Sequence, residues 1–350
     1  MDLYGRKWTR RELEARVGRL EQVAGIRKMK LTDGREADVE QIQVRTGAGL
    51  AYYVSPMHGM DISLAEFGGV PFSWQSPNGD VHPAYYDPNG AEWGRTAAGG
   101  LLMTCGLTQV GSPCEEGGRK YGQHGRAHHT AAAQTSAAGR WEGDEYEMMV
   151  SGAVEETAMF GENLRLTRII RSRLGENKIS ILDTVENIGH EMTPHMILYH
   201  FNFGFPLMSE MTKVSFPERE VVARDAGTPV EGFNRWESPQ PNYRERVYYH
   251  EPHAAAVTRE ETATVIISNP EFPLAGGTGP VEVRLTWNTR NLPRLVEWKM
   301  PGLGMHVLGV EPANCHVEGR VAERQRGSLV TLRPGAASTY ELELEIKARW

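Results

Sequence analysis

The stretch Arg165-Leu166-Thr167-Arg168-Ile169-Ile170-Arg171-Ser172-Arg173 indicates the fold class of this chain when it is read with the run that follows it. Apolar and polar residues alternate in it and again in residues 179–186, and a period of two is typical of a half-buried β-strand. Residues 174–178, which connect the two runs, have a turn-like composition with one glycine, so the pair predicts a β-hairpin. The arginines of the first run are expected to form a solvated strand face.

Similar runs recur along the rest of the chain. Residues 264–268, 281–287 and 304–310 continue the strand pattern, and apolar residues alternate with glutamates over 340–346. The 38 glycines and 20 prolines are spread along the chain and leave no low-complexity linker. These features predict an all-β fold built as a single large antiparallel β-sandwich.

One segment near the N-terminus predicts a helix. Thr9-Arg10-Arg11-Glu12 fits a capping box, in which the Thr hydroxyl and the Glu carboxylate satisfy free amide donors of the first helical turn. Apolar residues recur at helical spacing from Leu13 to Val23, and Gly25 then stops the run. We therefore expect residues 1–30 to form a helical appendage and residues 31–350 to form one domain.

Composition narrows the classes of partner and compartment. The formal net charge of the 350 residues is −7, which argues against general affinity for nucleic acid or for an anionic membrane. No apolar stretch approaches the roughly 20 residues that a membrane-spanning helix needs, and the N-terminus lacks a secretory signal. The three cysteines form neither a paired framework nor a C-x-x-C metal motif. A cytoplasmic location is the expectation.

Three segments carry the residue types that move protons near neutral pH. Glu311 ends the apolar run 304–310, His200 lies in an apolar strand-like segment, and His124 lies between two glycines. Apolar neighbours would desolvate the His200 imidazole and the Glu311 carboxylate and shift their pKa values. Each residue also has an ordinary structural interpretation: a buried core His, a rim Glu or an exposed turn His. The three together suggest acid–base chemistry on a polyhydroxylated substrate.

Polar neighbours of these histidines are further candidates for substrate binding. Arg126 follows His124 closely and offers a forked donor to hydroxyls or a carboxylate. Asn202 lies two residues after His200, so both side chains are expected on one face of the strand. His128 and His129 are adjacent, so we expect at most one of them to join His124. A metal centre that uses one of the two with His124, His200 and Glu311 stays open, although the spacing is not diagnostic.

The segment 55–63 adds two candidates, His58 and Asp61, and Trp74 follows in the segment 71–79. His58 is expected to face the cleft, whereas Asp61 either fixes a turn or contacts the substrate. Long loops are predicted over residues 76–100, 111–130 and 224–251, and loops of this length are more often functional than idle. They carry the aromatic residues Tyr85, Tyr86, Trp93, Trp236, Tyr243, Tyr248 and Tyr249.

Five motifs in this order resemble the aldose 1-epimerase (galactose mutarotase-like) superfamily, and most closely its DUF4432 branch. They span residues 56–62, 99–107, 124–126, 200–202 and 311–314, and the resemblance covers nearly the whole chain. In the first motif His58 stands where the branch has Arg. The resemblance implies a β-supersandwich with a sugar cleft on one sheet face.

The resemblance also implies roles for individual residues. Glu311 matches the general base of the family, His200 its general acid and His124 a substrate-positioning His, while Asp225 is a possible match for an additional Asp. The implied activity is the interconversion of sugar anomers without a cofactor, on a small sugar as the partner, in a chain that could form a homo-oligomer. Two alternatives stay open: a metal-dependent ketose or uronate isomerase or epimerase on the same scaffold, and a non-catalytic sugar-binding protein.

Overall fold

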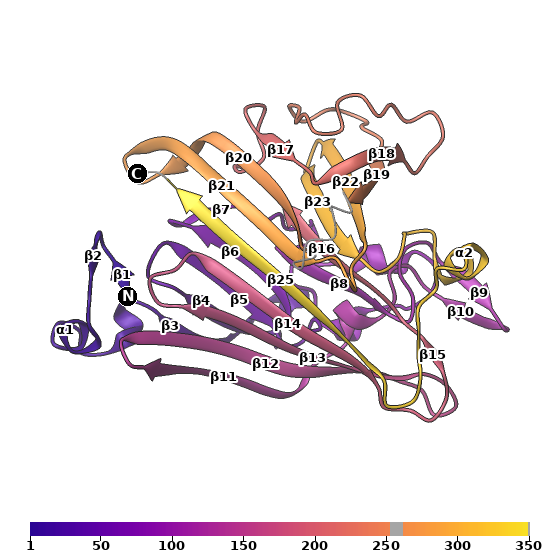
Figure 1. Ribbon diagram of the computed structural model, residues 1–350, viewed down its shortest axis with the longest axis horizontal. Helices are drawn as coiled ribbons and strands as arrows, with labels where there is room; N and C mark the ends of the chain where they lie inside the picture. The colour runs from indigo at the N-terminus through magenta and orange to yellow at the C-terminus, as the bar shows by residue number, and fades with distance from the viewer. Residues whose placement is uncertain (253–261, 349–350) are drawn as a thin grey trace.

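The computed structural model describes residues 1–252 and 262–348, and two large antiparallel sheets form its framework (Figure 1). The first sheet has eight strands and includes the hairpin predicted over residues 165–186, which is confirmed. In spatial order its strands are β11 (Ala133–Glu142), β12 (Glu145–Thr157), β13 (Asn163–Arg173), β14 (Lys178–Asn187), β25 (Ala337–Ala348), β21 (Gly277–Asn288), β20 (Thr262–Leu274) and β17 (Lys213–Ser215).

The second sheet has eleven strands and carries the candidate site. Its central strands β23, β16 and β8 pair antiparallel, so that residues far apart in the sequence lie side by side. In spatial order its strands are β18 (Glu218–Ala223), β19 (Arg246–Pro252), β22 (Arg294–Gly302), β23 (Met305–Ala313), β16 (Met196–Phe203), β8 (Leu102–Leu107), β6 (Asp61–Phe67), β5 (Leu50–Ser55), β4 (Glu40–Arg45) and β3 (Gly25–Lys30), and β7 (Val70–Pro71) pairs with β6.

Short elements complete the fold, and some of them lie at the ends of the sandwich. Figure 1 places α1, β1 and β2 at one end and α2, β9 and β10 at the other. They comprise β1 (Asp2–Leu3), β2 (Arg6–Lys7), α1 (Arg10–Glu14), β9 (Cys114–Glu116), β10 (Arg119–Tyr121), β15 (Thr193–Pro194), β24 (Thr331–Leu332), α2 (Arg320–Arg326) and five 3-10 helices: η1 (Leu20–Gln22), η2 (Gly34–Glu36), η3 (Pro83–Tyr85), η4 (Glu92–Arg95) and η5 (Ala127–His129). No helix in the described part of the chain is long and apolar enough to cross a membrane.

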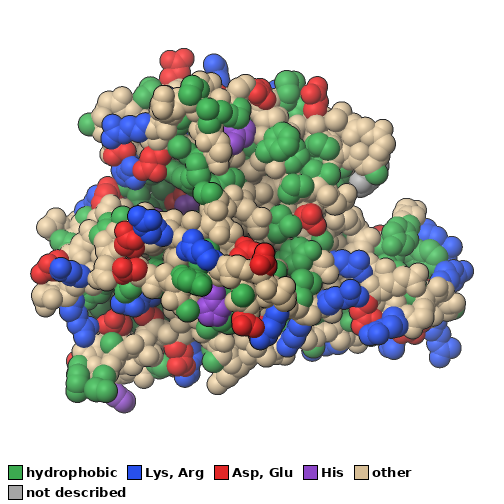
Figure 2. All heavy atoms as spheres, turned by 180° about the vertical axis from the view of Figure 1, so that it is seen from behind, with side chains coloured by type: hydrophobic (Ala, Val, Ile, Leu, Met, Phe, Trp, Pro, Cys, Tyr) green, Lys and Arg blue, Asp and Glu red, His purple; other side chains and the backbone are tan. Residues whose placement is uncertain are grey.

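The N-terminal helix is shorter than the sequence pattern predicts. The capping box of Thr9 and Glu12 is present, but α1 ends at Glu14, and Gly18 lies in the middle of the run that was expected to be helical. Glycine is a poor helix former, and here the chain turns to reach β3. Strand β3 begins inside residues 1–30 and pairs with β4, so the large sheet starts within the expected appendage. Figure 2 shows the N-terminal end as a protrusion on which Lys and Arg side chains gather.

The arginines of β13 do not share one solvated face, which corrects the expectation for Arg168. Its guanidinium is fully buried between the sheets, where it bonds Asp61 and Asp183, while Arg165 and Arg171 are partly exposed on the opposite face. Alternation with a period of two explains the difference, because Arg168 lies on the same face of the strand as the buried Leu166 and Ile170. The loop predicted over residues 224–251 is also wrong at its C-terminal end, since strand β19 begins at Arg246.

The eleven-stranded sheet buries both of its faces near the middle, and this arrangement creates room for a site. On β16, Tyr199 and Phe201 point into the core between the two sheets. Met196 and Leu198 alternate with them and join a second apolar cluster, with Cys105 among others, beneath the long loops. Side chains on this second face, which we call the outer face, are therefore buried by loops rather than by the other sheet.

Candidate active site

A cavity of about 670 Å³ lies on the outer face of the eleven-stranded sheet. Its floor includes His200 from β16, Glu311 from β23 and Trp298 from β22. The long loops supply other parts of the wall, among them His124 and Trp93. The cavity thus brings together the three residues that the sequence singles out for acid–base chemistry.

His200 and Glu311 form a buried pair. His200 Nε2 lies 3.1 Å from Glu311 Oε1, and the two residues are 6% and 2% exposed. Adjacent antiparallel strands place them together, because β16 residue Asn202 is opposite β23 residue Gly309. A Cβ atom at Gly309 would lie 2.7 Å from Glu311 Oε1 and 3.2 Å from His200 Cε1. Glycine at this position therefore leaves the space that the pair occupies.

Burial shifts the pKa values of this pair in opposite directions. It raises the pKa of Glu311 well above its usual value, and the carboxylate of Glu245 adds to the effect. It lowers the pKa of His200 to about 3, with a smaller contribution from the neighbouring His124. A protonated carboxyl and a neutral imidazole are the forms that burial favours. Both shifts favour the uncharged pair, with the proton on Glu311, over the ion pair.

His124 reaches the cavity from a tight loop. Its backbone is left-handed, with φ of 55°, and its main chain bonds Gly111 and Gly106. The ring centre lies 6.2 Å from that of His200, and burial lowers the pKa of His124 to about 4. Nδ1 of His124 and Nδ1 of His200 are buried atoms without a hydrogen-bond partner in the described part of the chain. Such atoms are rare in folded proteins and favour a ligand nearby.

The structure places two predicted substrate-binding residues away from the cavity, which corrects both expectations. His58 is 1% exposed, and its ring nitrogens lie 2.8 Å from Ser55 Oγ and from the Val81 carbonyl oxygen. Arg126 is exposed and lines a separate cavity of about 250 Å³, on the other side of the loop that carries His124. The direction of side chains in a loop does not follow a period in the sequence. The positions of His58 and Arg126 outside the cavity could therefore not be predicted from it.

Asp61 and Asn202 are structural neighbours of the site and do not line the cavity, so the structure corrects their expected contact with substrate. Asp61 is 2% exposed and accepts bonds from the main chain and hydroxyl of Thr104 and from Arg168. Asn202 is fully buried, and its amide donates to the carbonyl oxygens of Gly100 and His200. Asn202 therefore helps to fix the backbone that carries His200.

The adjacent histidines of the 111–130 region lie in the 3-10 helix η5 and not on a strand, and neither lines the cavity. His128 Nδ1 lies 2.7 Å from Asp61 Oδ2, and Nε2 accepts a hydrogen bond from the main-chain N–H of Ala98. His129 bonds Thr96. Neither ring joins His124 in the cavity, which agrees with the expectation that at most one of them would, because the helical turn directs both rings into the protein interior.

The remaining candidates line the cavity. Trp74 forms an edge-to-face pair with Trp298, with ring centres 6.0 Å apart. Asp225, whose role the sequence leaves open, bonds Arg224 at 2.7 Å, and the same guanidinium lies 3.1 Å from Glu245. Trp298 and Glu245 also line the cavity, and no sequence motif pointed to either of them. Trp298 is opposite Gly309 in the β22–β23 pairing, so the register of that hairpin is the signal that would have found it.

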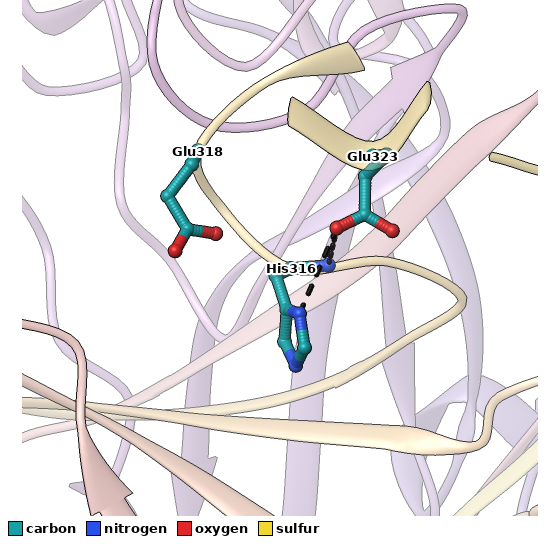
Figure 3. Close-up of side chains that lie close together, drawn as sticks. All are labelled: His316, Glu318 and Glu323. Atoms are coloured by element: carbon teal, nitrogen blue, oxygen red, sulfur yellow. Dashed lines mark hydrogen bonds and ion pairs between the residues drawn. The ribbon is translucent and has the colours of Figure 1, made fainter. Parts of the chain in front are cut away.

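One group of described residues has the spacing of a metal site, and it does not include His124, His200 or Glu311. His316, Glu318 and Glu323 offer ligand atoms within 4.8 Å of one another (Figure 3). Arg326 pairs with both glutamates, at 2.8 and 2.9 Å, and Glu323 also accepts hydrogen bonds from Ser328 and from the main chain of His316. The guanidinium thus already balances the charge that would attract a cation.

Comparisons with solved structures define the class of fold. A Klebsiella pneumoniae subsp. pneumoniae protein that carries a provisional assignment as an aldose 1-epimerase superposes with a TM-score of 0.83 at 22% identity, over 93% of this chain and 86% of that chain. Galactose 1-epimerase from Lactobacillus acidophilus NCFM gives a TM-score of 0.60 at 13% identity, over 93% of this chain and all of that chain. The fold is that of the galactose mutarotase-like proteins.

The family follows from the sequence model that matches. The domain of unknown function DUF4432 covers residues 36–346, and the chain belongs to that family. The Slr1438 protein from Synechocystis sp. PCC 6803 is a further structural neighbour, with a TM-score of 0.63 at 13% identity over 92% of this chain and all of that chain. No curated protein matches the sequence.

Proposed function

We propose that the chain is an isomerase of the aldose 1-epimerase type, which interconverts the anomers of a free sugar or sugar derivative. One observation carries the proposal: Glu311, His200 and His124 converge at one cavity and leave buried polar atoms there without protein partners. One group that takes a proton and another that gives one are what this reaction needs. The fold class, which includes a galactose 1-epimerase, supports the same conclusion.

The proposed reaction is reversible ring opening. Transfer of the Glu311 proton to His200, whose Nε2 lies 3.1 Å from Glu311 Oε1, gives a carboxylate and an imidazolium. Glu311 then takes the proton of the anomeric hydroxyl while His200 protonates the ring oxygen, and the bond from C1 to the ring oxygen breaks to give the open-chain aldehyde. This step returns the pair to its uncharged form, which burial favours. Rotation about C1–C2 and the reverse proton transfers close the ring on either face.

Other cavity residues would hold the sugar during this exchange. His124 has an unpartnered Nδ1 and would bond a hydroxyl near the reacting carbon. Trp74 and Trp298 offer aromatic surface on the cavity wall, and the apolar face of a sugar ring packs against such surface. A volume of about 670 Å³ is in the range of small-molecule sites.

The test is saturation-transfer NMR of anomeric exchange across a panel of sugars, with wild-type protein and two variants. Glu311→Gln removes the proposed base, and we expect it to slow exchange by roughly 10²–10⁴-fold. Glu318→Gln is the matched control, because Glu318 lines the same cavity but pairs with Arg326. The control should keep its rate within a few-fold of wild type.

Each outcome separates the proposal from its alternatives. Exchange that is unaffected by Glu311→Gln contradicts the acid–base role of the pair. Sugar binding without exchange of any sugar, from mildly acidic to neutral pH, favours a non-catalytic sugar-binding protein. Loss of exchange on chelation, together with a stoichiometric divalent metal in elemental analysis, favours a metal-dependent isomerase.

A further inference from the structure

Three indole rings line the cavity, from Trp74, Trp93 and Trp298, and the hydrogen-bonding states of two of their N–H groups differ sharply. Trp298 Nε1 donates to Glu245 Oε2 at 2.9 Å, so its hydrogen-bonding capacity is used within the protein. Trp93 Nε1 is buried and has no hydrogen-bond partner among residues 1–252 and 262–348. The side chain of Trp93 is thus a buried donor on the wall of a ligand-sized cavity.

A buried N–H group without an acceptor costs free energy, and most native structures avoid it. The indole nitrogen can only donate, so the missing partner must be an acceptor. Ring oxygens and hydroxyl oxygens of a sugar are acceptors of this kind. A ligand bound in the cavity can therefore supply the hydrogen-bond partner that the protein lacks.

Trp93 lies next to the groups of the proposed reaction. Its ring centre is 4.8 Å from that of His124, and His124 is 6.2 Å from His200. The 3-10 helix η4 holds the residue in place, since the main-chain carbonyl of Trp93 accepts from the N–H groups of Thr96 and Ala97. The rings of His128 and His129 lie about 6 Å away and pack on the same indole. These contacts therefore hold the indole in a fixed position beside the cavity.

We propose that Trp93 donates its indole N–H to one oxygen of the bound sugar and that it determines which sugars the site accepts at that position. The inference rests on the proposed function, because it assumes that the cavity holds a sugar. It assigns Trp93 a polar contact rather than only a stacking surface. A site built to bond one hydroxyl rejects the analogue that lacks it, since the buried donor then stays unpaired.

The experiment is a binding cycle between indole variants and deoxy sugars. Dissociation constants are measured by calorimetry for the best sugar of the panel and for each of its singly deoxygenated analogues, with wild type, Trp93→Phe and Trp298→Phe. One deoxy position should weaken binding to wild type by about threefold to tenfold, and Trp93→Phe should remove that discrimination. Trp298→Phe should keep the wild-type discrimination, because its N–H bonds Glu245.

Two results overturn the proposal while leaving the proposed function intact. Trp93→Phe could weaken every analogue by the same factor, which indicates a packing role, or it could change no affinity at all. Trp93→Tyr, measured in parallel, serves if Trp93→Phe does not fold; it should also lose the position-specific discrimination, and thermal unfolding reports whether each variant is native. If no sugar binds or exchanges with the wild-type protein, the proposed function and this inference fail together.

Discussion

Arg168 lies between the two large sheets, and its replacement by Met makes a sharp stability test. Its Nε and Nη2 donate three hydrogen bonds to Asp183 at 2.6–3.1 Å, and its Nη1 donates to Asp61 at 2.8 Å. Arg168 and Asp183 are fully buried and Asp61 is 2% exposed. Methionine fills much of the volume but leaves two buried carboxylates without their cation.

Removal of one partner from a buried ion pair typically costs 3–5 kcal/mol, and we expect Arg168→Met to lower the free energy of unfolding by about that amount. The control is Arg165→Met on the same strand. Arg165 pairs with Glu155, both side chains are about 40% exposed, and Arg165 lies on the opposite face of the strand from Arg168. We expect the control to lose less than about 1 kcal/mol. Urea unfolding followed by circular dichroism measures both. Equal losses in the two variants, or a loss below about 1 kcal/mol for Arg168→Met, would refute this reasoning.

Two further predictions concern a buried imidazole and a crowded glycine. His195 is fully buried and its folded pKa is lowered to about 4, so its contribution to stability is present above the unfolded pKa of 6.5 and is lost as pH falls toward 4. As pH falls from 6.5 to 4, the free energy of unfolding of His195→Gln should therefore drop by less than that of wild type, with a difference of up to about 3 kcal/mol. The control is His190→Gln, at an exposed position, which should follow wild type. Urea unfolding at a series of pH values measures this, and equal pH dependence of all three proteins would contradict the prediction. A Cβ at Gly122 would lie 2.1 Å from the Pro88 carbonyl oxygen, so Gly122→Ala should cost about 1–3 kcal/mol and slow anomeric exchange by displacing the loop of His124. Gly18→Ala, with nothing within 4 Å, is its control, and similar unfolding midpoints for the two would count against the close packing described.

The strand content and the hairpin over residues 165–186 could be predicted because period-two alternation is a local signal. The same alternation also predicts that Arg168 is buried, since Arg168 lies on the same face of the strand as Leu166 and Ile170. Residue type alone argues for exposure, and the acceptors that make burial possible, Asp61 and Asp183, lie on other strands. Burial of such a charge is set by tertiary partners that a strand pattern does not reveal.

The convergence of Glu311, His200 and His124 was a prediction from segments far apart in the sequence, and the structure brings all three to one cavity. The two strand residues meet because β16 and β23 are neighbours in the sheet. Arg126 shows where such reasoning fails, because two residues after His124 the chain presents its side chain to the other side of the loop. The direction of a loop side chain follows local packing, which has no period in the sequence.

The most direct measurement is a crystal structure of Glu311→Gln with a sugar that the wild-type protein exchanges. We predict that the anomeric oxygen lies within hydrogen-bond distance, about 2.6–3.2 Å, of the side chain at position 311, with the ring oxygen in similar reach of His200. A sugar bound outside this cavity, or bound inside it with the anomeric carbon turned away from both side chains, would contradict the proposed proton transfers.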